Sequence, residues 1–277
     1  NGVTYIDGTN DSNAYYALGY AHASDRMWQL EVQRRIGSGR LSEIFGKESL
    51  GEDIWLRTIG LHKSAEDALA NNSLSSDQLR SLYAYTAGIN EWIAEGNELP
   101  PEFHFFGFEP ESWRITDSLA WMKAFQMLLA GNMWEEIRKS TAKGSLTDEM
   151  YDSIYGLAAD SNHEISIAKE EHKTVKDFLQ IEKNLVSKLG LGGKYIGSNS
   201  WVVSGEYTES GRPTLVNDPH LKLQNPSLFY NARIVGDKLA VQGMTLVGLP
   251  VVIFGKNKDI AWGGTSLMAD VQDVFVE

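Results

Sequence analysis

Apolar residues in the first part of the chain recur at alternating steps of four and three, the spacing of one helical face. Between residues 12 and 36 this face carries Tyr16, Tyr20, Ala23, Met27 and Leu30. Gly37 and Gly39 follow, and glycine is typical of helix C-termini. The pattern predicts a short extended start over residues 3–6 and then a long helix.

Two further helices are predicted by their caps. Ser75 and Gln78 have the spacing of a capping box, and Gly96 marks the end of that helix. Its apolar side carries Leu79, Leu82, Tyr83, Ile89 and Ile93, with Thr86 as the polar member. Prolines flank an aromatic loop over residues 103–108. Thr116 or Asp117 then caps a third helix carrying Leu119, Met122, Phe125, Leu128 and Leu129.

The amino-acid composition of the chain changes twice after the predicted helices. From about residue 141 to 196 the apolar density falls, which is typical of a linker or removable spacer rather than core. Short β-branched runs then predict strands over residues 201–203, 214–216, 228–234, 251–254 and 271–276. Helices, spacer and strands predict an α+β fold divided into residues 1–140, 141–197 and 198–277.

Composition excludes several classes of partner. The 277 residues carry a formal net charge of −12, which disfavours nucleic acid. No run approaches the ~20 apolar residues of a membrane span, so no membrane insertion is expected. Cysteine is absent, which excludes disulfides and thiolate sites but leaves localisation open. The chain begins without a basic and apolar leader, so a cytoplasmic protein and one that has lost a signal peptide both stay open.

Common catalytic motifs are also missing from the sequence. No serine lies in Gly-x-Ser-x-Gly, which disfavours an α/β-hydrolase. There is no His-Glu-x-x-His, no P-loop and no Gly-x-Gly-x-x-Gly after a strand, so zinc proteases, P-loop enzymes and dinucleotide binders have no support. No organic cofactor is expected.

One short segment carries a chemistry of its own, Gly197-Ser198-Asn199-Ser200-Trp201, where the glycine-containing segment meets the first strand. A serine hydroxyl needs a base, and an α-amine with an ordinary pKa of ~7.7–8.0 can serve near neutral pH. Cleavage before Ser198 would place both groups on one residue. Small Gly197 would help the hydroxyl reach the preceding carbonyl for an N→O acyl shift. Taken alone, the segment is better read as a polar turn entering a strand.

Longer motifs resemble the penicillin acylase family along nearly the entire chain. They are Gly19 to Glu31, Arg34-Arg35 with Gly39 to Glu43, Tyr85-x-x-Gly88-Ile89-Asn90-x-Trp92-Ile93, Phe106-Gly107-Phe108-x-Pro110-x-x-Trp113, and Asn217-Asp218-Pro219-His220. The resemblance implies an N-terminal-nucleophile hydrolase with an αββα fold, here incomplete. It implies a precursor that cuts itself between Gly197 and Ser198.

The resemblance also implies roles for other residues. His220 would hydrogen-bond the nucleophile; penicillin G acylases carry glutamine there, and several cephalosporin and acyl-homoserine-lactone acylases carry histidine. The backbone N–H of Ser266, in Trp262-Gly263-Gly264-Thr265-Ser266, would stabilise the oxyanion. The family's second donor, a far-downstream asparagine, and its downstream arginine are not in this sequence. We therefore expect a truncated chain with incomplete catalytic machinery that lacks its downstream β-chain residues.

The resemblance also implies a structural calcium ion and an acyl pocket. Oxygen ligands suit Ca²⁺, and the matching positions are Glu136, Asp270, the backbone carbonyl near Gln272, and Asp273. Solvated surface carboxylates are the alternative reading. The pocket maps onto Leu221, Ile253, Phe254 and Met268. Leu221 and Met268 replace aromatic residues of penicillin G acylases, which favours a differently shaped, aliphatic acyl group; core residues are the alternative.

The expected activity is hydrolysis of a linear carboxamide in an N-acylated small molecule of penicillin type or a related kind. An acyl-homoserine-lactone acylase is the alternative enzyme. A non-catalytic scaffold or binding protein that keeps the fold is the alternative of another class. By resemblance alone, the protein is expected in the periplasm.

Overall fold

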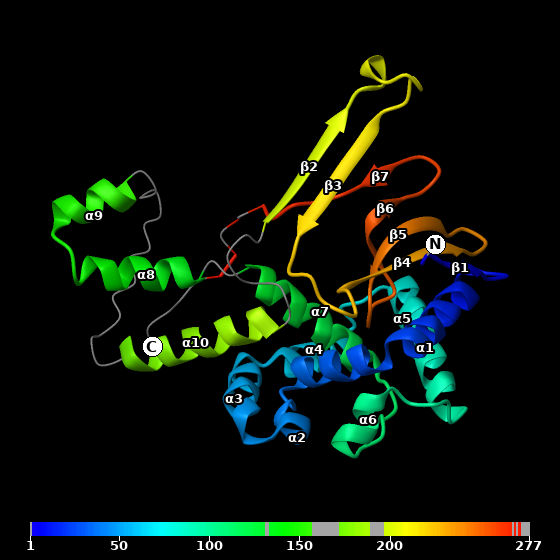
Figure 1. Ribbon diagram of the computed structural model, residues 1–277, viewed down its shortest axis with the longest axis horizontal. Helices are drawn as coiled ribbons and strands as arrows, with labels where there is room; N and C mark the ends of the chain where they lie inside the picture. Colours follow the sequence, from blue (N-terminus) through cyan, green and yellow to red (C-terminus); the bar gives the residue numbers. More distant parts are fainter. Residues whose placement is uncertain are drawn as a thin grey trace.

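A computed structural model describes residues 2–130, 133–156, 172–188, 197–267, 269 and 271–272. Most of the helices lie together against one side of a sheet, while a two-stranded hairpin projects from this body (Figure 1). In the described part of the chain, no helix combines the length and the apolar character needed to cross a membrane.

The long helix predicted near the start is α1 (Asp11–Ser38). Asn10 caps its first turn, and Gly39 ends it in the left-handed conformation. Gly37, which we expected to stop the helix, lies inside it. A Cβ at Gly37 would be 3.0 Å from Ala120 of α7 (Ile115–Ala130). The glycine therefore serves close helix packing rather than termination.

The capping box at Ser75 is confirmed at the start of α5 (Ser76–Ala94). Ser75 Oγ accepts from Gln78 N at 3.3 Å, and Gln78 Oε1 accepts from Ser75 N at 2.8 Å. The predicted apolar face was partly wrong, because Tyr83 is 63% exposed. The buried stripe consists of Leu82, Tyr85, Gly88, Ile89 and Trp92.

Two glycines let α1 and α5 approach closely and thereby determine which residues of α5 are buried. A Cβ at Gly19 would lie 2.0 Å from the carbonyl oxygen of Tyr85, and one at Gly88 would lie 1.9 Å from that of Tyr16. No side chain fits at such distances. The backbones of the two helices therefore touch, and the residues flanking Gly88 are the ones that become buried.

The predicted aromatic loop is instead largely helical, as α6 (Pro101–Phe106). Pro101 stands in the first turn, where its missing N–H costs nothing, and Gly107 ends the helix in the left-handed conformation. Phe106 stacks on Trp28 of α1 with ring centroids 5.4 Å apart. The remaining helical elements of the first half are α2 (Ser42–Phe45), η1 (Gly46–Ser49), α3 (Leu50–Ile59) and α4 (Leu61–Ala70).

The region expected to be a spacer contains helices in its described part. α8 (Met133–Lys143) leads into it, and α9 (Asp148–Tyr155) and α10 (His172–Lys188) lie within it. Leu185 of α10 is 1% exposed and belongs to the main core cluster, next to residues of α3. The expectation that this region lies outside the core was therefore wrong for α10. Whether the region can be removed stays a prediction.

The main sheet has the order β1-β4-β5-β6-β7. β1 (Thr4–Asp7) runs parallel to β4 (Phe229–Val235), and the other neighbours are antiparallel. β6 (Val252–Lys256) matches a predicted strand, whereas β5 (Ala240–Leu246) and β7 (Ala261–Trp262) were not predicted. Residues 271 and 272, predicted as strand, are not in one.

A second, two-stranded sheet pairs β2 (Gly197–Val203) with β3 (Thr214–His220), and η3 (Gly205–Tyr207) lies in their connection. Both strands were predicted, although each is longer than expected. Trp201 and Val202 are exposed on this hairpin.

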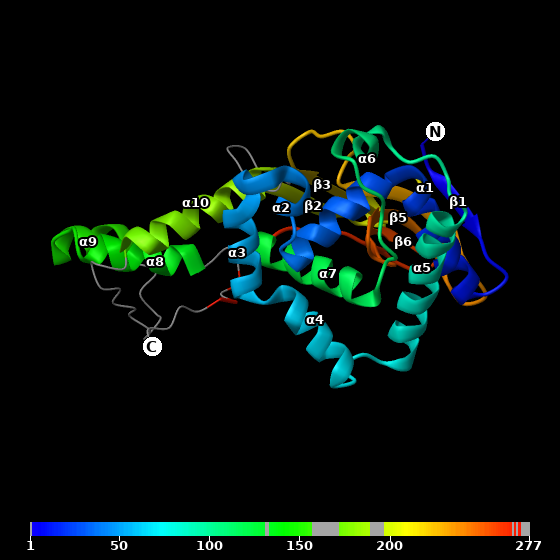
Figure 2. The ribbon, with the colours of Figure 1, turned by 90° about the horizontal axis from the view of Figure 1, so that it is seen from below.

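α1, α5 and α7 lie against the main sheet, whereas α8 and α9 extend away from it (Figure 1 and Figure 2). Buried positions alternate along β4, where Tyr230, Ala232 and Ile234 face the core formed with α1 and α5. Helices packed on a sheet agree with the predicted α+β class. The described residues form one helix layer and one main sheet, and the complete αββα arrangement stays a prediction.

A buried histidine links this helix layer to the sheet. His22 of α1 contacts Tyr85 Oη through Nδ1 at 2.7 Å and Thr245 Oγ1 through Nε2 at 3.0 Å. Thr245 donates its own proton to the carbonyl oxygen of Tyr230, and Tyr85 accepts from Gly248 N. Thr245 Oγ1 therefore accepts from Nε2, and the network fits a neutral His22 whose Nδ1 accepts from Tyr85 Oη. Burial lowers the pKa of His22 to about 3.

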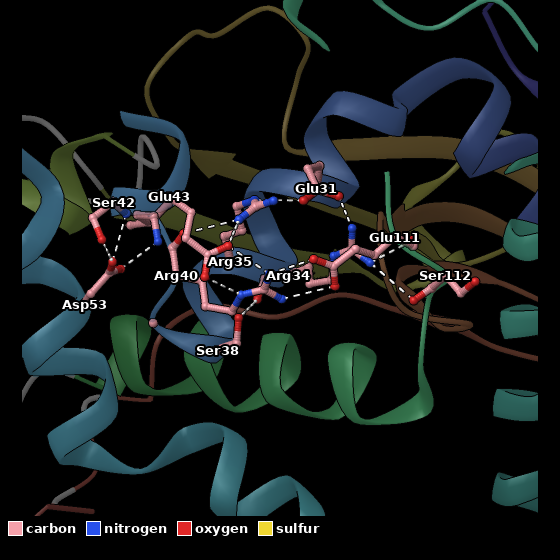
Figure 3. Close-up of polar contacts among 12 residues, drawn as sticks. Glu31, Arg34, Arg35, Ser38, Arg40, Ser42, Glu43, Asp53, Glu111 and Ser112 are labelled. Atoms are coloured by element: carbon pink, nitrogen blue, oxygen red, sulfur yellow. Dashed lines mark hydrogen bonds and ion pairs between the residues drawn. The ribbon is translucent and has the colours of Figure 1, made fainter. Parts of the chain in front are cut away.

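A chain of ion pairs fixes the end of α1 (Figure 3). Glu31 is fully buried between Arg34 and Arg35. Arg35 also binds Glu43 at 2.5 Å, and Arg40 bridges Glu43 to Glu111. A buried carboxylate needs such partners, because removing one charge of a buried pair costs about 3–5 kcal/mol.

Candidate functional site

The β2–β3 hairpin carries the predicted nucleophile and the predicted histidine near one end, but on opposite faces: His220 lies on the face of Asn199 and Asp218, and Ser198 lies on the face of Pro219. Gly197 pairs with His220, Ser198 with Pro219 and Asn199 with Asp218. Side chains of directly opposed residues in antiparallel strands lie close together. The segment 197–199 and the segment 218–220 thus form the end of one ladder.

Ser198 is half-buried, and Gly197 before it is exposed. A Cβ at Gly197 would meet no atom within 4 Å. Packing in this structure therefore does not require glycine at the predicted cleavage position. The proposed chemical reason, access of the hydroxyl to the preceding carbonyl, stays a prediction.

His220 is oriented by its neighbours on the hairpin. Its Nε2 lies 2.8 Å from Asp218 Oδ2 and 3.4 Å from Asn199 Nδ2. A single nitrogen cannot donate to the carboxylate and accept from the amide, and the shorter contact to the carboxylate favours an Nε2–H that donates to Asp218. Among the described contacts of His220 there is no hydrogen bond to Ser198.

Asn217 is a site residue to which the sequence interpretation gave no role. Its Nδ2 donates to the carbonyl oxygens of Asn199 at 2.9 Å and of Gly264 at 3.0 Å, and its Oδ1 accepts from Gly264 N at 3.0 Å. A Cβ at Gly263 would lie 2.7 Å from Asn217 Oδ1. One amide therefore fastens the Gly263-Gly264 segment to the strand that carries Ser198. The Asn217-Asp218-Pro219-His220 block was visible in the sequence, but this contact was not.

The predicted oxyanion donor lies on the fastened segment. Ser266 is exposed and follows Gly264 by two residues. Of the predicted pocket residues, Phe254 lies beside this segment, because a Cβ at Gly264 would be 3.6 Å from its ring. The Phe254 ring also meets Phe229, with centroids 5.5 Å apart. The Ser198, Asn217 and Phe254 regions are thus joined through residues 263–264.

The other predicted pocket residues have no described contact with residues 263–264. Leu221 follows β3 directly, Ile253 lies in β6, and both are half-buried against the main core cluster. Met268 lies outside the described residues. The alternative reading of Leu221 and Ile253 as core residues fits these contacts.

The predicted calcium ligands are described only in part. Glu136 lies half-buried in α8, and Gln272 Oε1 accepts from Met133 N at the start of that helix at 3.4 Å. Asp270 and Asp273 lie outside the described residues. Within the described part, no group of three or more histidines and carboxylates could hold a metal. Glu136 and Gln272 supply the oxygen donors that Ca²⁺ prefers and lie on neighbouring segments.

Comparison with known proteins identifies the family. A family model described as penicillin amidase matches residues 1–277. Penicillin acylase 2 proenzyme of Pseudomonas sp. (strain SE83) is 30% identical over 100% of this chain and 36% of its own length. Acyl-homoserine lactone acylase QuiP of Pseudomonas fluorescens (strain Pf0-1) is 29% identical over 100% of this chain and 34% of its own length.

Penicillin G acylase of Escherichia coli is more distant, at 23% identity over 100% of this chain and 39% of its own length. The chain thus spans between a third and two fifths of these relatives. Each of these matches covers the whole of this chain. The chain belongs to the penicillin amidase family.

Proposed function

We propose that this chain contains the processing site of an amidohydrolase precursor and that cleavage between Gly197 and Ser198 makes Ser198 an N-terminal nucleophile. The observation that carries the proposal is the end of the β2–β3 hairpin: Ser198 stands in β2 opposite Pro219, and Asn217 ties the same strand to the segment before Ser266. The family membership supports the reaction class.

The proposed chemistry uses the serine twice. In processing, Ser198 Oγ attacks the carbonyl carbon of Gly197, the peptide nitrogen leaves as the new α-amine, and water hydrolyses the resulting ester. In catalysis the α-amine takes the hydroxyl proton while Oγ attacks the substrate carbonyl, and then gives that proton to the leaving amine. Water releases the acid from the acyl-enzyme. The backbone N–H of Ser266 stabilises the oxyanion in both steps.

Intact-mass measurement of the protein as synthesised tests the processing step. We expect two polypeptides, the second beginning at Ser198. Ser198→Ala removes the nucleophile and is expected to give one uncut polypeptide. Ser200→Ala, on the same strand, is the matched control and is expected to be cut. An uncut parent protein, or a Ser198→Ala variant that is still cut at this bond, would refute the proposal and favour a non-catalytic scaffold.

The substrate is proposed to be an N-acylated small molecule with a linear carboxamide. Two kinds of relative support two candidates, a penicillin and an N-acyl-homoserine lactone. Leu221 and Met268, which stand where the resemblance has aromatic residues in penicillin G acylases, favour an aliphatic acyl chain and therefore the lactone. Comparing acid release from long- and short-chain N-acyl lactones and from penicillins decides between them. Processed protein that hydrolyses neither class would overturn both substrate proposals.

Two further features belong to the same proposal. A structural Ca²⁺ is held by Glu136, Asp270, Asp273 and the backbone carbonyl near Gln272, and supplies no chemical step. The protein acts in the periplasm, which fractionation of the producing cells tests by the compartment in which the processed form is found.

A further inference from the structure

A cavity of about 360 Å³ lies on the helical side of the molecule. It is enclosed by the end of α1, by α3, by the start of α4 and by the segment that leads into α7. Its charged lining residues include Arg34, Arg40, Arg57, Lys63, Glu111 and Arg114. None of these residues belongs to a strand, so the cavity is separate from the Ser198 cluster.

The wall of this cavity is basic, although the chain is acidic overall. Most of its cations already have carboxylate partners: Arg34 binds Glu31, Arg40 binds Glu43 and Glu111, and Lys63 binds Asp67. Arg57 and Arg114 differ, since neither pairs with a carboxylate among the described residues. Their guanidinium groups are therefore available to a ligand.

Two of the arginines are held in place by the protein itself. Arg57 Nε donates to the carbonyl oxygen of Gly39 at 2.8 Å, and Gly39 leaves room for the stem of Arg57, which a Cβ would meet at 2.7 Å. Arg34 is 2% exposed, and its Nη1 donates to the carbonyl oxygen of Glu111 at 2.9 Å. Figure 3 shows Arg34, Ser38, Arg40 and Glu111 along this wall.

Arg34 also retains one unused donor. Its buried Nε has no acceptor in the described part of the structure. A buried donor on a cation is costly to leave unpaired. That nitrogen has almost no accessible surface, so Arg34 contributes its positive charge to the cavity wall rather than a free donor.

A helix terminus adds to the positive potential. α4 begins at Leu61 with Gly60 as a cap that has no side chain, and its first turn carries no acidic residue. Gly60, His62 and Lys63 of this turn line the cavity. The N-terminus of a helix carries a positive partial charge and favours anions.

Several carbonyl and carboxylate oxygens of the wall already accept hydrogen bonds from the protein. The carbonyl oxygen of Arg34, in the last turn of α1, accepts from Ser38 Oγ at 2.8 Å, and that of Gly39 accepts from Arg57. Asp117 Oδ2 accepts from Arg114 N at 2.8 Å. Burial raises the pKa of Asp117, with Arg34, His62 and Arg114 acting against it.

We propose that this cavity binds the phosphate group of a small phosphorylated organic molecule. The two arginines without a carboxylate partner among the described residues come from different elements, Arg57 from α3 and Arg114 from the segment before α7, and the N-terminus of α4 lines the cavity beside them. Guanidinium groups from separate elements suit a tetrahedral group with three acceptor oxygens. The volume exceeds that of inorganic phosphate, so there is space for an organic part.

Calorimetric titration of the intact protein with glycerol 3-phosphate at constant ionic strength tests the proposal, with inorganic phosphate and acetate as further probes. We expect saturable binding of glycerol 3-phosphate, weaker binding of phosphate and none of acetate. Arg57→Gln and Arg114→Gln should each weaken the binding of glycerol 3-phosphate about tenfold, since each removes a charged hydrogen-bond donor. Both side chains are exposed, so both variants should fold.

Arg212→Gln is the matched control, because Arg212 is an exposed arginine in the connection between β2 and β3. It should bind glycerol 3-phosphate as the parent does. Absence of saturable binding, an equal loss in the Arg212 variant, or acetate binding as tightly as glycerol 3-phosphate would each overturn the proposal. Circular dichroism of each variant identifies any loss of fold. Cleavage at Gly197–Ser198 is expected to be unchanged in all three variants, which separates this outcome from the proposed function.

Discussion

At the scale of single residues, Asn217 has the greatest consequence for the proposed chemistry. Its one amide group holds the strand of the proposed nucleophile and the segment of the proposed oxyanion donor at a fixed separation. Positioning of this kind matters because catalysis depends on donors that are in place before charge develops.

We predict that Asn217→Ala slows self-cleavage at Gly197–Ser198 about tenfold or more, because removal of one preorganised contact misplaces the donor. Asn217→Asp should slow it as well, since a carboxylate cannot donate to the carbonyl oxygens of Asn199 and Gly264. The measurement is the rate of appearance of the two polypeptides by mass spectrometry. Asn231→Ala, in β4, is the control. Normal processing in both Asn217 variants would contradict a positioning role.

His22 provides a prediction about pH. The unfolded chain binds a proton on this histidine below pH 6.5, but the folded protein does so only near 3. The free energy of unfolding should therefore fall as the pH falls through this window, by up to about 1.4 kcal/mol per pH unit from this residue. Above the window, His22 adds no pH dependence.

Urea unfolding at a series of pH values measures this effect. In the His22→Asn variant the slope between pH 6.5 and 3 should decrease by the contribution of the lost histidine. His104→Asn, at an exposed position on α6, should keep the slope of the parent. Equal slopes in parent and His22 variant would show that the histidine is not the source.

At this scale the sequence indicated which residues could take part in the chemistry. It did not indicate which groups those residues would contact. The motif around Ser198 and the block ending at His220 could be recognised, whereas the strand register, which puts their side chains on opposite faces of the hairpin, could not. The partner of Asn217 lies 47 residues away, and no local spacing reports such a contact. Likewise, the ion pairs of Arg34 and Arg35 with Glu31 follow helical spacing, whereas the lack of a carboxylate partner for Arg57 and Arg114 among the described residues emerges only from the fold.

At the scale of elements, the α1–α5 contact leaves less room for a Cβ than any other contact of the described glycines. We predict that Gly88→Ala lowers the free energy of unfolding by about 3 kcal/mol, since the new methyl group would collide with the backbone of Tyr16. Urea unfolding measures the loss. Gly144→Ala is the control, because its Cβ would meet neighbouring atoms only at 3.8 Å or more. A loss of the same size in both variants would refute the packing explanation.

Two elements that the sequence did not predict, α3 and β5, share a physical cause. The buried side of α3 includes Glu52 and Asp53 as well as Trp55 and Leu56, so carboxylates interrupt its apolar stripe. Asp53 is buried because it accepts from Leu41 N and Ser42 N at the start of α2. β5 contains Gly243, where a Cβ would lie 2.1 Å from the carbonyl oxygen of Phe254. In both elements a tertiary contact decides a residue that the local pattern cannot explain.

At the scale of the whole molecule, the proposed metal ion would join the helical part to the last described segment. We predict that Ca²⁺ raises the melting temperature and that a chelator reverses the effect. A concentration a hundredfold above the dissociation constant corresponds to about 2.7 kcal/mol of stabilisation. Differential scanning calorimetry with and without Ca²⁺ measures the shift. Glu136→Gln should abolish it and Glu149→Gln, on exposed α9, should not; a shift that survives in Glu136→Gln would contradict the proposed ligand.

The parallel pairing of β1 with β4 has a consequence for the protein after the proposed cut. Thr4 to Asp7 precede the cut bond and align with Ala232 to Val235, which follow it. Backbone hydrogen bonds and a shared core therefore cross between the two products. The nicked protein should migrate as a single particle on a native column and separate into two bands only in denaturant, so that cleavage changes covalent connectivity and leaves the folded unit in one piece.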